Sequence, residues 1–106
     1  MAIVAGNPRA VRSFLGDSLM AERSAQIVNK LGIHARPAAE IVKTASRFKS
    51  NIVIIRDDLE VNAKSIMGVM MLAAEHGSFI VIRAEGDDAE AALDAICKVV
   101  ADGFGE

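Results

Sequence analysis

The stretch Gly32-Ile33-His34-Ala35-Arg36-Pro37-Ala38 places an imidazole and a guanidinium two residues apart at the predicted start of a helix. Pro37 suits the first turn of a helix, where its missing N–H costs no intrahelical hydrogen bond. The residues that follow keep helical spacing, namely Ala39, Val42 and Ala45. His34 is therefore predicted to lie just before the first turn, where free backbone amides and the positive end of the helix dipole attract an anion.

The two polar side chains of this stretch suit phosphoryl chemistry. The planar fork of Arg36 matches the oxygens of a phosphoryl group. A neutral imidazole keeps one ring nitrogen unprotonated, and that nitrogen is a competent nucleophile. Pattern alone also allows a plainer interpretation, in which His34 is a polar loop residue or a helix cap.

Two longer segments carry a resemblance to a known family. The segment NKLGIHARPA, Asn29 to Ala38, closely resembles the phosphorylation-site motif of the HPr family, the histidine phosphocarriers of the bacterial sugar phosphotransferase system. The segment VNAKSIMGVM, Val61 to Met70, resembles the regulatory serine motif of that family. Its Ser65 follows His34 by 31 residues (65 − 34), which suits the family spacing. The resemblance runs from about Met20 to the C-terminus.

The resemblance implies a phosphocarrier with a phosphohistidine intermediate rather than an enzyme with its own turnover. Enzyme I would phosphorylate His34, and IIA-type domains would take the phosphoryl group onward, either in sugar transport or in the nitrogen-related regulatory branch. Arg36 would neutralise its charge, and Pro37 would give the helix a rigid start that exposes its amides. Regulatory phosphorylation of Ser65 by an HPr kinase/phosphorylase is also implied, where the host has one.

Several residues around these motifs have a structural and a functional interpretation. Ser65 is a good helix N-cap as well as a candidate phosphorylation site. The apolar residues after it fit either a core or a docking patch for enzyme I, IIA-type domains and the kinase, because methionine adapts to several partners. They are Ile66, Met67, Met70 and Met71. Lys43 and Arg47 share a predicted helix face, which is either solvated or meets acidic partner surfaces.

Composition indicates one cytoplasmic domain without a cofactor. The chain has 106 residues, 52% hydrophobic and 25% charged, which suffices for one globular domain with a modest core. Its net charge of −2 gives no reason to bind nucleic acid or an acidic membrane. Cys97, the one cysteine, cannot form an intramolecular disulfide, and no cysteine–histidine cluster suggests a metal site. No apolar run approaches the roughly 20 residues of a membrane span, and no signal peptide is evident.

The order of predicted elements is β-α-β-β-α-β-α. It comprises a strand over 22–29, a helix over 37–48, a hairpin over 51–56 and 59–63, a short helix from Ser65 closed by Gly77, a strand over 79–85 and a helix from Asp87 to Gly103. This string permits an α+β open-faced β-sandwich, a four-stranded antiparallel sheet with three helices on one face, as in the HPr family. The hairpin turn Asp57-Asp58 lacks the glycine common in that family, which leaves the turn type open.

Residues 1–19 precede the HPr-like domain of residues 20–106. They represent either a misassigned start or a real extension, and their apolar residues have the spacing of a short amphipathic helix. These are Val11, Phe14, Leu15 and Leu19. Alternation places Val53, Ile55, Phe79 and Val81 on the sheet face away from the helices. We expect the extension to cover that patch within a monomer. The alternatives are that the extension is a disordered tail, or that the patch forms the interface of a homodimer.

Two other functions fit parts of the sequence. A ferredoxin-like ligand-sensing domain has a similar string of elements, and His34 would then be incidental. A regulatory HPr relative would work through Ser65 alone, but such relatives lack the acceptor histidine. Cys97 is predicted to pack on the last helix, and His76 to face solvent at a helix end.

Overall fold

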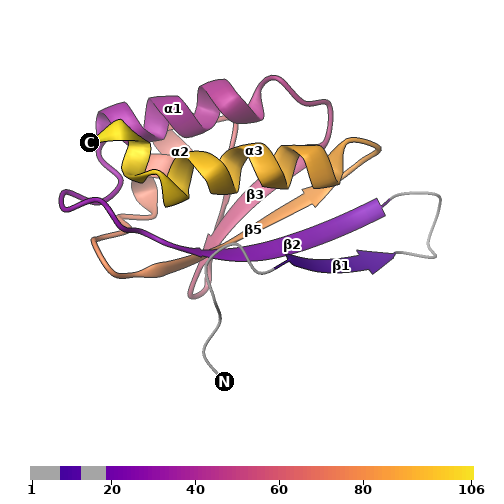
Figure 1. The fold of residues 1–106 in the computed structure, drawn as a ribbon, viewed down its shortest axis with the longest axis horizontal. Coiled ribbons are helices and arrows are strands. Elements are labelled where there is room, and N and C mark those ends of the chain that lie inside the picture. The colour runs from indigo at the N-terminus through magenta and orange to yellow at the C-terminus, as the bar shows by residue number, and fades with distance from the viewer. Residues whose placement is uncertain (1–7, 13–18) are drawn as a thin grey trace.

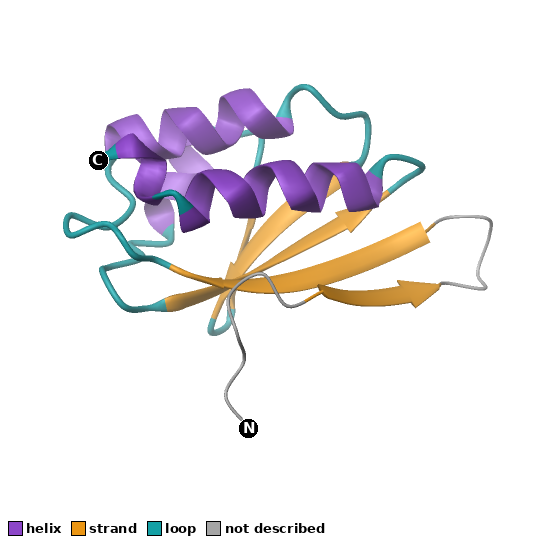
Figure 2. Ribbon diagram, in the orientation of Figure 1, coloured by secondary structure: helices purple, strands orange, loops and turns teal. Residues whose placement is uncertain are grey.

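An antiparallel sheet with helices on one face organises the chain (Figure 1). The computed structural model describes residues 8–12 and 19–106. The strands are β1 (Pro8–Arg12), β2 (Leu19–Gln26), β3 (Asn51–Arg56), β4 (Leu59–Asn62) and β5 (Phe79–Glu85), in the spatial order β1-β2-β5-β3-β4. The helices are α1 (Ala35–Ala45), α2 (Ile66–Met71) and α3 (Ala89–Ala101), followed by the 3-10 turn η1 (Gly103–Gly105). All three helices lie on the same side of the sheet (Figure 2).

The predicted open-faced sandwich is confirmed by strands β2, β5, β3 and β4 and the three helices. Alternation along the two central strands also has the predicted register. Ile52, Ile54, Ile80 and Ile82 are buried beneath the helices. On the opposite face, Val53, Ile55 and Val81 are half-buried and Phe79 is exposed. Arg83 lies among them and pairs with Glu22 at 2.6 Å and Glu60 at 3.4 Å.

The helix predicted in the N-terminal extension is wrong for Pro8–Arg12, which forms the edge strand β1. Its register runs from Pro8 opposite Arg23 to Arg12 opposite Leu19. A short helix is marginal by itself, whereas pairing satisfies backbone groups along the edge of β2. We expected the extension to cover the open face of the sheet. Pro8–Arg12 instead extend the sheet at its edge as β1, so this prediction is wrong for these residues. The rest of the predicted helix, which includes Phe14 and Leu15, falls within residues 13–18. The structure does not describe these residues.

Two helix boundaries differ from the prediction. Helix α1 starts at Ala35 because His34, with φ −99°, takes the N-cap position, so Pro37 becomes the third residue of the first turn. It ends at Ala45, and Arg47 and Phe48 continue only as a turn. Helix α2 ends at Met71, and the chain reverses at Ala73, whose φ is +49°, rather than at Gly77.

The hairpin between β3 and β4 turns without glycine. Asp57 takes a φ of +54°, and Arg56 pairs with Leu59 across the two-residue loop. Aspartate enters the left-handed region more readily than most residues with a side chain, which explains why the turn closes here. In the part of the chain that the structure describes, no helix has the length and hydropathy to cross a membrane.

Candidate functional site

His34 lies at the N-terminal end of α1. Its carbonyl accepts the first intrahelical hydrogen bond, from the Ala38 amide at 2.9 Å, while its side chain makes no capping bond and is 38% exposed. The amides of Ala35 and Arg36 precede that first bond, so they have no carbonyl one turn earlier to pair with. No acidic residue lies in the first turn. The positive end of the helix is therefore uncompensated within α1 itself.

The loop before His34, at Gly32 and Ile33, packs against Ala74 and Glu75 in the segment after α2. The Ile33 amide donates to the Ala74 carbonyl at 2.8 Å. Gly32 has a φ of +68°, and a Cβ there would lie 2.5 Å from the same carbonyl oxygen. Only glycine fits this approach, because any side chain would strain the backbone and collide with Ala74. From the other side, Asn29 Nδ2 donates to the Gly32 carbonyl at 2.7 Å.

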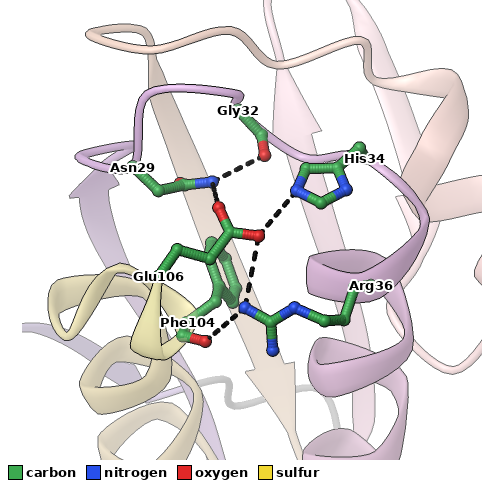
Figure 3. A network of polar contacts seen from close by, with 6 residues as sticks. All are labelled: Asn29, Gly32, His34, Arg36, Phe104 and Glu106. Carbon is green, nitrogen blue, oxygen red and sulfur yellow. Dashed lines mark hydrogen bonds and ion pairs between the residues drawn. The ribbon is translucent and has the colours of Figure 1, made fainter.

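The C-terminal residue, Glu106, completes the site (Figure 3). Its Oε2 lies 2.6 Å from His34 Nε2 and 3.2 Å from Arg36 Nη2. Its Oε1 accepts from Asn29 Nδ2 at 2.9 Å. One carboxylate therefore links the loop residue Asn29, the N-cap His34 and the helical Arg36.

This network determines which nitrogen of His34 is free. The hydrogen bond from Asn29, together with the contacts of His34 and Arg36, holds the pKa of Glu106 below its ordinary value. An ionised carboxylate can only accept, so His34 Nε2 must carry the proton of their shared hydrogen bond. In a neutral imidazole, Nδ1 then has the free lone pair. The arrangement can therefore offer Nδ1 as a nucleophile.

Arg36 is anchored by the C-terminal segment. Its Nη2 donates to the Phe104 carbonyl at 2.7 Å as well as to Glu106, and its side chain is 51% exposed. Pro37 is buried beside it in the first turn of α1. The structure thus brings His34, Arg36 and Pro37 together, with the C-terminal segment held against the first two.

Ser65 has the predicted capping geometry. Its Oγ accepts from the Gly68 amide at 3.1 Å, and it is half-exposed at the N-cap of α2. The core interpretation of the methionines is wrong, because Val69 alone of this helix is buried and Met67 is 73% exposed. Ile66, Met70 and Met71 are exposed as well. This short helix forms an exposed apolar surface.

Lys43 and Arg47 are both exposed, Lys43 on α1 and Arg47 in the turn after it. Neither forms an ion pair within the described residues. The Arg47 guanidinium lies 5.5 Å from the centre of the Phe48 ring. Both cations are therefore accessible to a partner surface.

Two residues of the site were missed by the sequence. Asn29 lies within the quoted motif, five residues before His34. No local sequence pattern predicts that its side-chain amide bonds to Gly32 and Glu106. Glu106 is 72 residues from His34, so no spacing rule connects them. Both are found only when the chain is folded.

The remaining chemically notable side chains lie outside this network. Cys97 is buried, and burial raises the pKa of its thiol while nearby Arg23 opposes that shift. His76 is exposed, as predicted. Over residues 8–12 and 19–106, no group of three or more His, Cys, Asp and Glu side chains could hold a metal ion.

Comparison with known proteins gives one consistent result. The family model described as "PTS HPr component phosphorylation site" matches residues 21–102. The phosphocarrier protein HPr of Treponema pallidum is 49% identical over 87 residues, which cover 82% of this chain and 99% of that protein.

Two solved structures are similar in both sequence and fold. HPr-C-His from Thermoanaerobacter tengcongensis has a TM-score of 0.77 and 48% identity, covering 80% of this chain and 96% of that one. The phosphocarrier protein HPr from Bacillus anthracis has a TM-score of 0.73 and 49% identity, covering 76% and 96%.

Proposed function

Because this chain belongs to the HPr family, as a phosphocarrier component of the phosphotransferase system and not an independent enzyme, we propose that His34 carries its phosphoryl group. Enzyme I is the donor and IIA-type domains are the acceptors. The observation that supports this role most directly is the 2.6 Å contact of His34 Nε2 with Glu106, which leaves Nδ1 with the free lone pair. We expect the exchange to take place in the cytoplasm, with the chain acting as a monomer.

Transfer proceeds as an in-line displacement in both directions. The Nδ1 lone pair forms the new N–P bond as the bond between phosphorus and the donor breaks. The phosphoryl oxygens then lie near the free amides of Ala35 and Arg36 at the positive end of α1. Few groups of this chain bind the phosphoryl group, so the phosphorylated state is not strongly stabilised and an acceptor can remove the group.

Arg36 neutralises the phosphoryl group in this proposal. Its guanidinium is held by the Phe104 carbonyl and by Glu106, at 2.7 and 3.2 Å. A phosphoryl group on His34 brings negative charge next to the Glu106 carboxylate, and like charges repel. We therefore expect Arg36 to exchange Glu106 for phosphoryl oxygens when His34 is phosphorylated.

The exposed surface of α2 provides the docking site for partners. Ile66, Met67 and Met70 supply adaptable apolar contacts, and the cations Lys43 and Arg47 suit acidic partner surfaces. Phosphorylation of Ser65 by an HPr kinase/phosphorylase would add negative charge to this surface and oppose docking.

Incubation with enzyme I and phosphoenolpyruvate tests the central proposal. Intact mass should show one acid-labile phosphoryl group, which is lost in His34→Ala and kept in the control His76→Ala. NMR of the phosphorylated protein should place the group on Nδ1. Arg36→Ala should fold normally and react about tenfold to a hundredfold more slowly, since it removes a charge-assisted donor. An unmodified wild-type protein would refute the proposed function.

A further inference from the structure

Arg56, at the end of β3, holds the C-terminal end of α2. No basic residue lies in the last turn of this helix, so it has no cation of its own near its last carbonyls. Arg56 supplies one from the neighbouring strand: Nη1 donates to the Leu72 carbonyl at 3.2 Å and to the Ala73 carbonyl at 2.5 Å. Its Nη2 pairs with Glu75 at 2.9 Å.

The segment that Arg56 holds has an unfavourable backbone conformation. Ala73 has a φ of +49°, in the left-handed region that a residue with a Cβ rarely occupies. Such a conformation persists only when surrounding contacts stabilise it. The bonds of Arg56 to the carbonyls on either side of this reversal provide that stabilisation.

The loop that precedes His34 packs against the same segment. The Ala74 carbonyl, next to the residue that Arg56 binds, accepts from the Ile33 amide at 2.8 Å. Gly32 approaches so closely that an added Cβ would be 2.9 Å from Glu75 Cα. A contiguous set of contacts therefore leads from Arg56 through Ala73 and Ala74 to the residue before His34.

We propose that Arg56 is a positioning residue for phosphoryl transfer, acting on His34 through the 72–75 segment. This inference rests on the proposed function of His34. Without the guanidinium, the 72–75 reversal relaxes, the Ile33 amide loses a fixed acceptor, and the imidazole is aligned for in-line attack less of the time. The first turn of α2, with Ile66 and Met67, keeps its Ser65 cap, so docking is largely preserved.

Kinetics of phosphorylation by enzyme I test this role with Arg56→Met and the matched control Arg83→Met. Arg83 also makes two ion pairs, but on the open sheet face. With this chain as the phosphoryl acceptor, Arg56→Met should lower the kcat of enzyme I about fivefold to tenfold, because a misplaced reacting group slows the transfer step. The KM of enzyme I for the chain should stay within about twofold of the wild-type value. Arg56→Lys should recover part of the loss, and Arg83→Met should match the wild type. Equal kcat values for Arg56→Met and Arg83→Met would overturn the proposal.

Amide hydrogen exchange gives a second measurement that needs no partner. Arg56→Met should accelerate exchange at Ile33, whose amide bonds to Ala74, and leave Ile27, whose amide bonds to Ser78 at 2.9 Å, unchanged. Unchanged Ile33 exchange, or equal acceleration at both amides, would contradict the positioning role. A wild-type protein that enzyme I cannot phosphorylate would instead refute the proposed function, while Ile33 exchange would still decide whether Arg56 holds the loop.

Discussion

Glu106 Oε2 lies 2.6 Å from His34 Nε2, so the last residue of the chain is hydrogen-bonded to the candidate phosphoacceptor. The carboxylate also contacts Arg36, and it thus occupies a position between the two side chains assigned to phosphoryl binding. In the unphosphorylated protein it orients the imidazole and anchors the guanidinium. If His34 is phosphorylated on Nδ1, we expect Arg36 to exchange Glu106 for phosphoryl oxygens, whereas Nε2 can keep its hydrogen bond to Glu106.

The first prediction concerns the pKa of Glu106. Its pKa is lowered from 4.5, with the hydrogen bond from Asn29 as the largest cause. Asn29→Ala should therefore raise this pKa toward the ordinary value, as measured by carboxyl chemical shifts during an acid titration. A pKa that stays at its wild-type value in Asn29→Ala would contradict this assignment.

The sign of the resulting pH dependence follows from linkage. A depressed carboxyl pKa means that the ionised form is favoured in the folded state. The stabilisation by Glu106 is therefore present above about pH 4.5 and is lost as pH falls through its folded pKa. Glu106→Gln should remove this part of the acid dependence of the melting temperature.

A second prediction separates the two roles of Ser65. Ser65→Ala should lower stability by about 1 kcal/mol, because the Gly68 amide loses its acceptor. Ser65→Asp retains a capping oxygen, so its melting temperature should stay at the wild-type value while phosphorylation of His34 by enzyme I slows. An unchanged rate in Ser65→Asp would leave Ser65 as a cap alone.

A third prediction concerns Asp88, which joins the start of α3 to the loop before β3. Its carboxylate accepts from the Ser50 hydroxyl and amide and, at 2.8 Å, from the Lys49 amide. The Ser50 hydroxyl, followed by the Lys49 amide, lowers the pKa of Asp88 below 3.8. Asp88→Asn should lower the melting temperature at pH 7, because a neutral amide accepts these hydrogen bonds more weakly than a carboxylate.

The pH dependence of that effect provides its control. The contribution of Asp88 is fully present above its ordinary pKa and is lost as pH falls through the lowered value. Calorimetry from pH 7 down to pH 2 should show the wild type and Asp88→Asn converging in melting temperature. A constant difference between them would argue against an electrostatic origin.

A fourth prediction concerns β1, which pairs with β2 over Leu19–Arg23. Removal of residues 1–18 leaves the backbone groups of this edge unpaired, and an unpaired edge invites association with a second copy. We expect a lower melting temperature and concentration-dependent dimers in light scattering, with His34 still phosphorylated. A monomeric truncated protein of unchanged melting temperature would contradict this role for β1.

The sequence by itself determined the features that depend on local periodicity and local hydrogen bonds. Alternation along β3 and β5 identified which isoleucines are buried, because successive side chains of a strand point to opposite faces. The Ser65 cap spans three residues, and the His34 motif lies at one helix terminus, so both were readable from adjacent letters.

Only the tertiary structure decided the contacts between distant segments. Glu106 reaches His34 from 72 residues away, and β1 pairs where an isolated pattern favours a helix. Ala73 reverses the chain in a conformation that alanine itself disfavours, because Arg56 and the packed His34 loop stabilise it from outside. Spacing along the chain does not encode such contacts, since they depend on how the chain closes on itself and on burial that outweighs local preference.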